Sequence, residues 1–78
     1  MAKIRIGQRF QVEEGAGLGS GRVGVVVAAT PRHLRQLNAD CPGRYSSVAF
    51  DRSRELLLRD EHTHMLFSMF KRYLEPMP

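Results

Sequence analysis

Glycine occupies every second position between residues 15 and 21, at Gly15, Gly17, Gly19 and Gly21. Glycines this dense make a helix costly, and they leave no side chains with which one face of a strand could pack. The run therefore predicts a loop at 15–21. The next segment, RVGVVVAAT, is rich in β-branched residues and predicts a strand directly after the loop.

A strand is also expected before the loop, because side chains alternate between apolar and polar from residue 3 to residue 13. Ile4, Ile6, Phe10 and Val12 share one face of an extended chain over this segment. A period of two is typical of a strand that is buried on one face. The two strands and the glycine loop together predict a β-hairpin.

Part of the loop, GSGRVG at 19–24, fits the G-x-G-x-x-G spacing of dinucleotide-binding sites. Such a site requires glycines that open a helix, whose N-terminus holds the pyrophosphate. Here the glycines open a strand, and 78 residues leave no room for the βαβ unit of that site. We therefore interpret the motif as a hairpin loop and expect no cofactor.

Residues 30–44 predict a short helical insertion between strands. Thr30 is a favourable N-cap, and Pro31 suits the first helical turn. Leu34 and Leu37 lie three residues apart, so a short helix would turn both inward. The turn-forming residues of NADCPG are expected to end it.

The segments YSSVAFD and RELLLRD flank Arg52 and Ser53 and predict a second hairpin. The side chains expected to meet in its core are Val48, Phe50, Leu56 and Leu58.

Residues 62–72 are compatible with two structures. Apolar positions between Leu66 and Leu74 fit one helical face, but a strand from Met65, a tight turn and a short strand at Tyr73–Glu75 fit equally well. Four or five short strands separated by turns favour a small antiparallel barrel, and we expect residues 1–78 to form one domain.

The segment IGQRFQVEEGAGLGSGRVGVVV resembles the KOW-type signature of small SH3-like barrels, in which a glycine loop joins two strands. The matching positions are Gly7, Phe10, Val12, Gly15, Gly21, Val23, Gly24 and Val26. VAFDRSRELLLR is similar to the third and fourth strands of such barrels, and YLEP is similar to their last strand after a helical turn. The glycine loop and the insertion at 30–44 depart from the family.

The resemblance implies a mainly β, SH3-like antiparallel barrel of about five strands with a short helical insertion. KOW-containing domains often bind RNA, DNA, or ribosomal and transcription partners, whereas other SH3-like barrels bind peptides or serve as subunits and scaffolds. The resemblance therefore implies binding rather than catalysis, and the fold transfers more safely than any activity.

The charge pattern adds a nucleic-acid hypothesis. Twelve Lys and Arg side chains against eight Asp and Glu give a net charge of +4, and ten of the cations are arginine, which binds phosphate bidentately. We predict an arginine-rich face that binds RNA or DNA; the alternative is a cationic surface that scattered acids neutralise. The candidate nucleic-acid ligands are Lys3, Arg5, Arg9, Arg22, Arg32, Arg35, Arg52 and Arg54.

The apolar segment 65–70 supports a different function, that of a protein-interaction or self-assembling module. Methionine and phenylalanine side chains form adaptable contact surfaces when they are exposed. The candidate partner-binding residues are Met65, Phe67, Met69 and Phe70. The other interpretation of this segment is that it closes one end of the barrel.

Metal binding and catalysis have weaker signals. His62 and His64 would share one face of an extended chain, with His33 or Cys41 to complete a zinc set, but structural zinc normally takes paired ligands from two arms. Cys41 and His33 could form a nucleophile and a base, yet no third residue is evident to orient them. We therefore predict no metal site and no enzymatic activity.

The chain also carries indications of its compartment. MAKIRIGQRF places charges where a signal peptide needs apolar residues, and no apolar run approaches the roughly 20 residues that cross a bilayer. Cys41 is the single cysteine, so no disulfide can form within the chain. A cytoplasmic location without membrane binding is expected.

Overall fold

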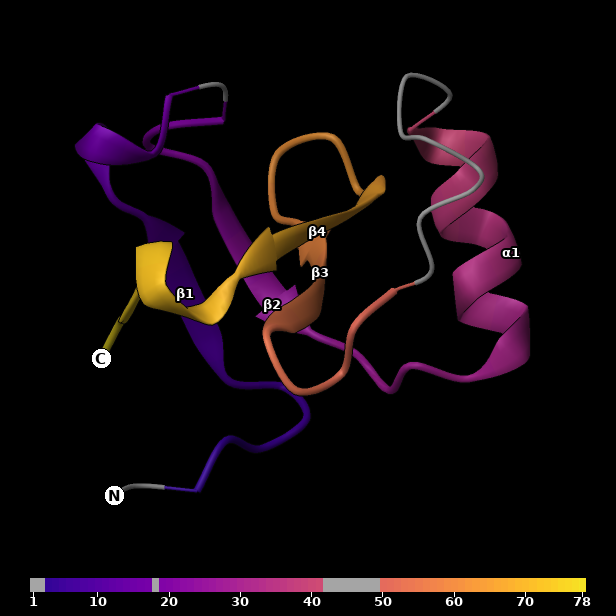
Figure 1. Ribbon diagram of the computed structural model, residues 1–78. Coiled ribbons are helices and arrows are strands. Elements are labelled where there is room, and N and C mark those ends of the chain that lie inside the picture. Colours follow the sequence, from indigo (N-terminus) through magenta and orange to yellow (C-terminus); the bar gives the residue numbers. More distant parts are fainter. Residues whose placement is uncertain (1–2, 18, 42–49) are drawn as a thin grey trace.

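The computed structural model describes residues 3–17, 19–41 and 50–78. Within these residues five strands form one sheet, and every paired set of strands is antiparallel. They are β1 (Arg9–Val12), β2 (Val23–Val26), β3 (Glu55–Asp60), β4 (Leu66–Phe70) and β5 (Leu74–Pro76). The order across the sheet is β4-β3-β2-β1-β5 (Figure 1). The prediction of a mainly β domain with about five strands is confirmed.

The sheet is open in the part of the chain that the structure describes, so the expected barrel is not closed by a β4–β5 ladder. Its two edge strands are instead joined in sequence by the 3-10 turn η2 (Lys71–Tyr73). Strand β5 has three residues, and its last, Pro76, pairs with Phe10 of β1. A strand this short that ends in proline has little backbone left to pair on a second side.

The first hairpin is confirmed, because β1 and β2 pair with Arg9 opposite Val25 and Gln11 opposite Val23. The 3-10 turn η1 (Glu14–Ala16) opens its loop. Gly17, Gly19 and Gly21 all have positive φ angles, so the loop uses conformations that other residues rarely adopt.

The first strand is shorter than predicted, since β1 begins at Arg9 rather than at residue 3. Gly7 has a φ of 89°, and the turn at 5–8 directs the preceding chain away from the sheet. Ile4 and Ile6 are consequently 37% and 66% exposed instead of buried. Their alternation reflects an exposed segment and not a continuous strand.

The predicted insertion contains the helix α1 (Pro31–Asp40), which begins as expected. Thr30 Oγ1 accepts a hydrogen bond from the backbone N–H of His33 at 3.1 Å, and Leu37 is buried. At the other end of the helix, Asp40 Oδ2 accepts from the backbone N–H of Leu66 at 2.8 Å. The helix end thus covers part of the edge strand β4, which would otherwise be open to another chain. Residues 42–44 of the insertion lie outside the described residues.

Two hydrophobic clusters pack against the sheet. The inner cluster contains Phe10, Val12, Val26, Leu56, Leu58, Phe67 and Leu74. The helix–sheet cluster contains Leu37, Leu57 and Leu66, with Phe50 packed against it. Because successive side chains of a strand point to opposite faces, β3 contributes to both clusters and is buried on both sides.

The second hairpin differs from the prediction. Strand β3 pairs with β2 on one side and with β4 on the other, and neither Phe50 nor Asp51 belongs to a strand. Ser53 instead closes a local turn on the Asp51 carboxylate, which accepts from its N–H and its hydroxyl. The other expected core residue, Val48, lies outside the described residues. Of the two structures expected for residues 62–72, a helix or a strand followed by a tight turn, the second is correct, because β4 is followed by η2 and β5.

Candidate functional site

Two of the predicted phosphate ligands, Arg9 and Arg22, are committed to ion pairs within the fold. Arg9 binds Glu61 through two hydrogen bonds of 2.5 and 3.0 Å, and this pairing lowers the pKa of the glutamate. Arg22 Nε lies 2.7 Å from Asp60 Oδ2, and its guanidinium lies 3.9 Å from the ring centroid of Phe67. Both guanidinium groups therefore already have a carboxylate partner within the fold.

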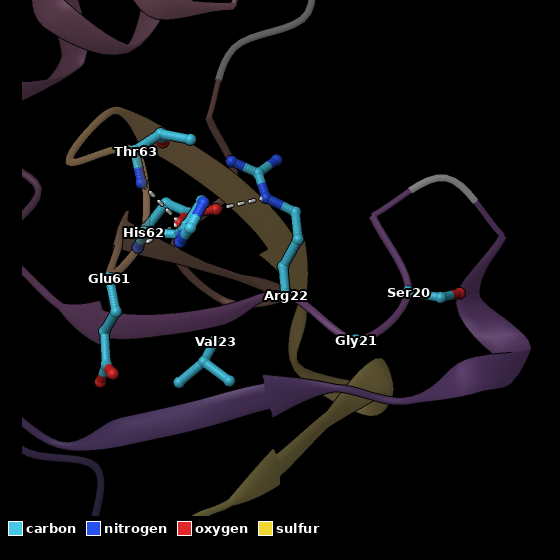
Figure 2. Close-up of a pocket in the computed structure, with 8 residues that line it drawn as sticks. Ser20, Gly21, Arg22, Val23, Glu61, His62 and Thr63 are labelled. Atoms are coloured by element: carbon cyan, nitrogen blue, oxygen red, sulfur yellow. Dashed lines mark hydrogen bonds and ion pairs between the residues drawn. The ribbon is translucent and has the colours of Figure 1, made fainter.

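The Arg22–Asp60 pair lines a hollow of about 530 Å³ beside the glycine loop, between residues 20–23 and 60–63 (Figure 2). Asp60 is 4% exposed, and its Oδ1 accepts from the backbone N–H groups of His62 at 2.7 Å and Thr63 at 3.1 Å. The carboxylates of Asp60 and Glu61 would repel an anion here. The geometry therefore makes this hollow a structural junction rather than a phosphate cradle.

Replacing Asp60 by asparagine should lower the free energy of unfolding at neutral pH by about 2 kcal/mol, since hydrogen bonds to charged groups contribute about 1.5–3 kcal/mol. Burial by itself raises the pKa of Asp60, but hydrogen bonds from Arg22, Thr63 and His62 outweigh it and hold that pKa below its ordinary value. Such a carboxylate stabilises the fold above the unfolded pKa of about 3.9, and its contribution is lost as the pH falls through the lower folded pKa.

Urea unfolding over a pH series measures this effect. The difference between wild type and Asp60→Asn should be complete at neutral pH and shrink below about pH 4. Glu61→Gln is the control, because its pair with Arg9 is exposed and water screens it, so its effect should be much smaller. An Asp60→Asn difference that stays constant down to the acid transition would contradict the assignment.

Four other predicted cations meet on a different surface, around three contiguous hollows. The first, of about 400 Å³, is lined by Arg54, Phe70, Lys71 and Arg72. The second, of about 530 Å³, is lined by Lys3, Arg5, Ile6 and Gln8. The third, of about 280 Å³, shares Lys71 with the first and Arg5 and Ile6 with the second, and it adds Arg52. We call the six cations of these hollows the basic surface: Lys3, Arg5, Arg52, Arg54, Lys71 and Arg72.

The third hollow places an apolar floor between the cations. Its lining includes Ile4, Ile6, Val26 and Phe50, and it joins the N-terminal segment to the turn before β3, which Figure 1 shows at the same end of the sheet. Glu55 also lines it, but this acid is 8% exposed and its Oε2 accepts from the backbone N–H of Asp51. The charge presented to solvent here is therefore predominantly positive.

Backbone contacts hold the basic surface in place. Arg52 donates to the carbonyl of Ala29 at 2.6 Å, and the N–H of Lys71 donates to the carbonyl of Arg54 at 2.8 Å. Asp51 lies 3.8 Å from Arg54, but both side chains are well exposed, so this pair neutralises Arg54 weakly.

An aromatic group lies at one end of this surface. Phe70 is 43% exposed, and its ring meets that of Tyr73 edge-on at a centroid distance of 6.3 Å. The Arg72 guanidinium lies 5.3 Å from the Phe70 centroid and 4.8 Å from the Tyr73 centroid. The two rings and the planar guanidinium above them together form a surface on which another planar group can stack.

The structure thus divides the eight predicted ligands. Lys3, Arg5, Arg52 and Arg54 line the basic surface, whereas Arg9 and Arg22 are paired internally. Arg32 and Arg35 are exposed on α1 and do not line any of the three hollows. Sequence reasoning missed Lys71 and Arg72, although the pattern FKRY, with two cations between aromatic residues, could have indicated them.

The apolar segment 65–70 does not form the expected exposed patch. Phe67 is 2% exposed in the inner cluster, and Met69 is half-buried. Met65, directly before β4, and Phe70, the last residue of β4, are exposed. The alternation of a strand explains the difference, because it turns Phe67 to the core.

The residues considered for metal binding or catalysis have other roles or positions. His62 and His64 lie in the turn between β3 and β4 rather than on an extended chain, and His64 has a φ of 63°. The His33 ring lies 2.6 Å from the carbonyl of Ala28, and Cys41 donates to the carbonyl of Leu66 at 3.2 Å. Among residues 3–17, 19–41 and 50–78, no three His, Cys, Asp or Glu side chains group as a metal site would require.

Over the same ranges no helix has the length and apolar character that spanning a membrane requires. Comparison of the chain with protein-family models, with characterised proteins and with solved structures found no match.

Proposed function

We propose that this chain is a non-enzymatic nucleic-acid-binding domain of SH3-like, KOW-type fold that acts in the cytoplasm. The observation that carries the proposal is the convergence of six cations, from three distant parts of the sequence, around contiguous hollows. A row of cations that spans several hollows matches a repeating polyanion better than a single small anion.

Two features of the fold support the SH3-like assignment. The strand order β4-β3-β2-β1-β5 brings the last strand back beside the first, and the 3-10 turn η2 precedes that short strand. The second of these agrees with what the KOW-type resemblance implies for the YLEP segment, a last short strand after a helical turn. The open sheet and the helix α1 are departures from it.

The test compares two double variants, one that reverses two charges within the basic surface and one that reverses two charges on the helix α1. Arg5→Glu/Arg54→Glu and Arg32→Glu/Arg35→Glu change the net charge equally, and all four side chains are exposed. The first variant should bind labelled oligonucleotides at least about tenfold more weakly at about 50 mM salt. The magnitude of its slope of log K against log salt should fall by about 1.4 for single strands and about 1.8 for duplex DNA, since two phosphate contacts are lost. The helix variant should retain most of the affinity.

Fluorescence anisotropy titrations at several salt concentrations measure both quantities. Equal losses in the two variants would mean that net charge, rather than this surface, causes binding. Wild-type protein that binds neither RNA nor DNA at low salt would refute the proposal.

The competing function, a self-assembling or protein-binding module, has less support. Burial of Phe67 and partial burial of Met69 leave Met65 and Phe70 as separate exposed side chains, and single exposed apolar residues are normal on protein surfaces.

A further inference from the structure

We propose that Phe70, together with Arg72 and Tyr73, forms a stacking site for an unpaired base, so that the basic surface binds single-stranded RNA or DNA in preference to duplex. This inference rests on the proposed nucleic-acid function and names the class of ligand. The three residues occupy the end of β4 and the turn η2.

The first support is the position of the ring. Exposure of 43% would by itself be ordinary for Phe70, but this ring also lines the hollow of about 400 Å³ together with Arg54, Lys71 and Arg72. A ring with three cations around one hollow can contact a base and its flanking phosphates at the same time.

The second support is that the stacking site is held in place before any ligand arrives. Hydrogen bonds hold both ends of η2, one from the N–H of Lys71 to the carbonyl of Arg54 at 2.8 Å and one from the N–H of Glu13 to the carbonyl of Tyr73 at 2.9 Å. The edge-on contact with Tyr73 and the Arg72 guanidinium orient the Phe70 ring further. An ordered platform loses little conformational entropy on binding.

The preference for single strands follows from what the ring can reach. Bases in a duplex already stack on their neighbours, so Phe70 gains no free base face there, whereas the bases of a single strand can turn outward. Next to the stacking site, the apolar hollow with Ile4 and Ile6 on its wall offers a surface to a neighbouring base. A duplex would use the cations alone.

The experiment compares four probes of about 20 nucleotides, namely oligo-dT, oligo-rU, a DNA duplex and an abasic deoxyribose-phosphate strand. Wild-type protein should bind oligo-dT or oligo-rU at least about tenfold more tightly than the duplex or the abasic strand. Phe70→Leu should weaken single-strand binding by about fivefold to a hundredfold and leave duplex and abasic binding unchanged. Met65→Leu, at an equally exposed position directly before β4, is the matched control and should have no effect. The dT and rU arms show which backbone is preferred.

Phe70→Trp gives a second readout that does not depend on how well Phe70→Leu folds. The chain has no tryptophan, so this substitution introduces a single indole at the stacking site, and its emission can be excited apart from that of the two tyrosines. Its emission should be quenched by oligo-dT or oligo-rU and much less by the abasic strand. Two results would overturn the inference: equal affinity for duplex and single strands, or indole emission that stays unquenched in the single-strand complex. Either result would leave the proposed nucleic-acid binding intact, because the charge-reversal variants test that separately. Failure of all four probes to bind would refute the proposed function itself.

Discussion

Gly24→Ala should lower the melting temperature by about 10–20 °C, a loss of about 2–3 kcal/mol in a domain of this size. Gly24 lies in β2, opposite Phe10 of β1 and Asp60 of β3. A Cβ at this position would lie 2.9 Å from the Cβ of Leu58 and 3.0 Å from two ring carbons of Phe67. The Leu58 Cβ is tied to the backbone of the interior strand β3, and Phe67 is buried, so neither can move aside cheaply.

Thermal unfolding followed by circular dichroism measures this loss. Gly15→Ala is the control, because a Cβ there meets nothing within 4 Å, and it should be neutral or slightly stabilising. Phe67→Leu removes the ring atoms that a Cβ at Gly24 would meet, so the double variant should be less destabilised than the sum of the two single variants. A Gly24→Ala protein as stable as Gly15→Ala would show that Leu58 and Phe67 do not pack closely against Gly24.

Leu57→Ala is the second substitution with a large expected effect, a loss of about 2–5 kcal/mol from the cavity that it leaves. Leu57 is 2% exposed between Leu37 of α1 and Leu66 of β4. A strand buried on one face only would leave this side chain in water, because Leu56 and Leu58 already face the inner cluster. The expected loss therefore measures the packing of the helix on the sheet.

Chemical denaturation compares Leu57→Ala with two other variants. Leu58→Ala, whose side chain is 0% exposed, should lose a similar amount from the inner cluster. Ile6→Ala, with 66% of the residue exposed, should change stability by less than about 0.5 kcal/mol. A Leu57→Ala effect as small as that of Ile6→Ala would contradict the position of the helix.

Three consecutive leucines, Leu56 to Leu58, carry the signal for two-sided burial, since a strand covered on both faces reads as a continuous apolar run. Sequence reasoning placed Leu56 and Leu58 in the core and paired their strand with the segment before Arg52. The pairing partners of β3 depend on residues far apart in the sequence. No local pattern could therefore distinguish the observed partners, β2 and β4, from the expected hairpin partner.

The candidate site was only partly predictable, because it too depends on which strands pair. The cations Lys3, Arg5, Arg52 and Arg54 could be listed from the sequence, but so could Arg9 and Arg22. What separates them is the pairing of β2 with β3, which sets Gly24 opposite Asp60 and brings the carboxylates of 60–61 to Arg22 and Arg9. An arginine that is neutralised within the fold looks the same in sequence as one that is free.

Local structure in this protein follows directly from its amino-acid order. Glycines that tolerate positive φ angles made the loop at 15–21, a Thr-Pro pair began the helix, and β-branched residues made β2, all through interactions among neighbouring residues. Which strands pair, which side of β3 the helix covers, and which cations share a surface depend instead on long-range packing. The GSGRVG segment shows both levels. Its local context excludes a dinucleotide site, while the packing of Leu58 and Phe67 against Gly24 gives its last glycine a role that spacing alone could not indicate.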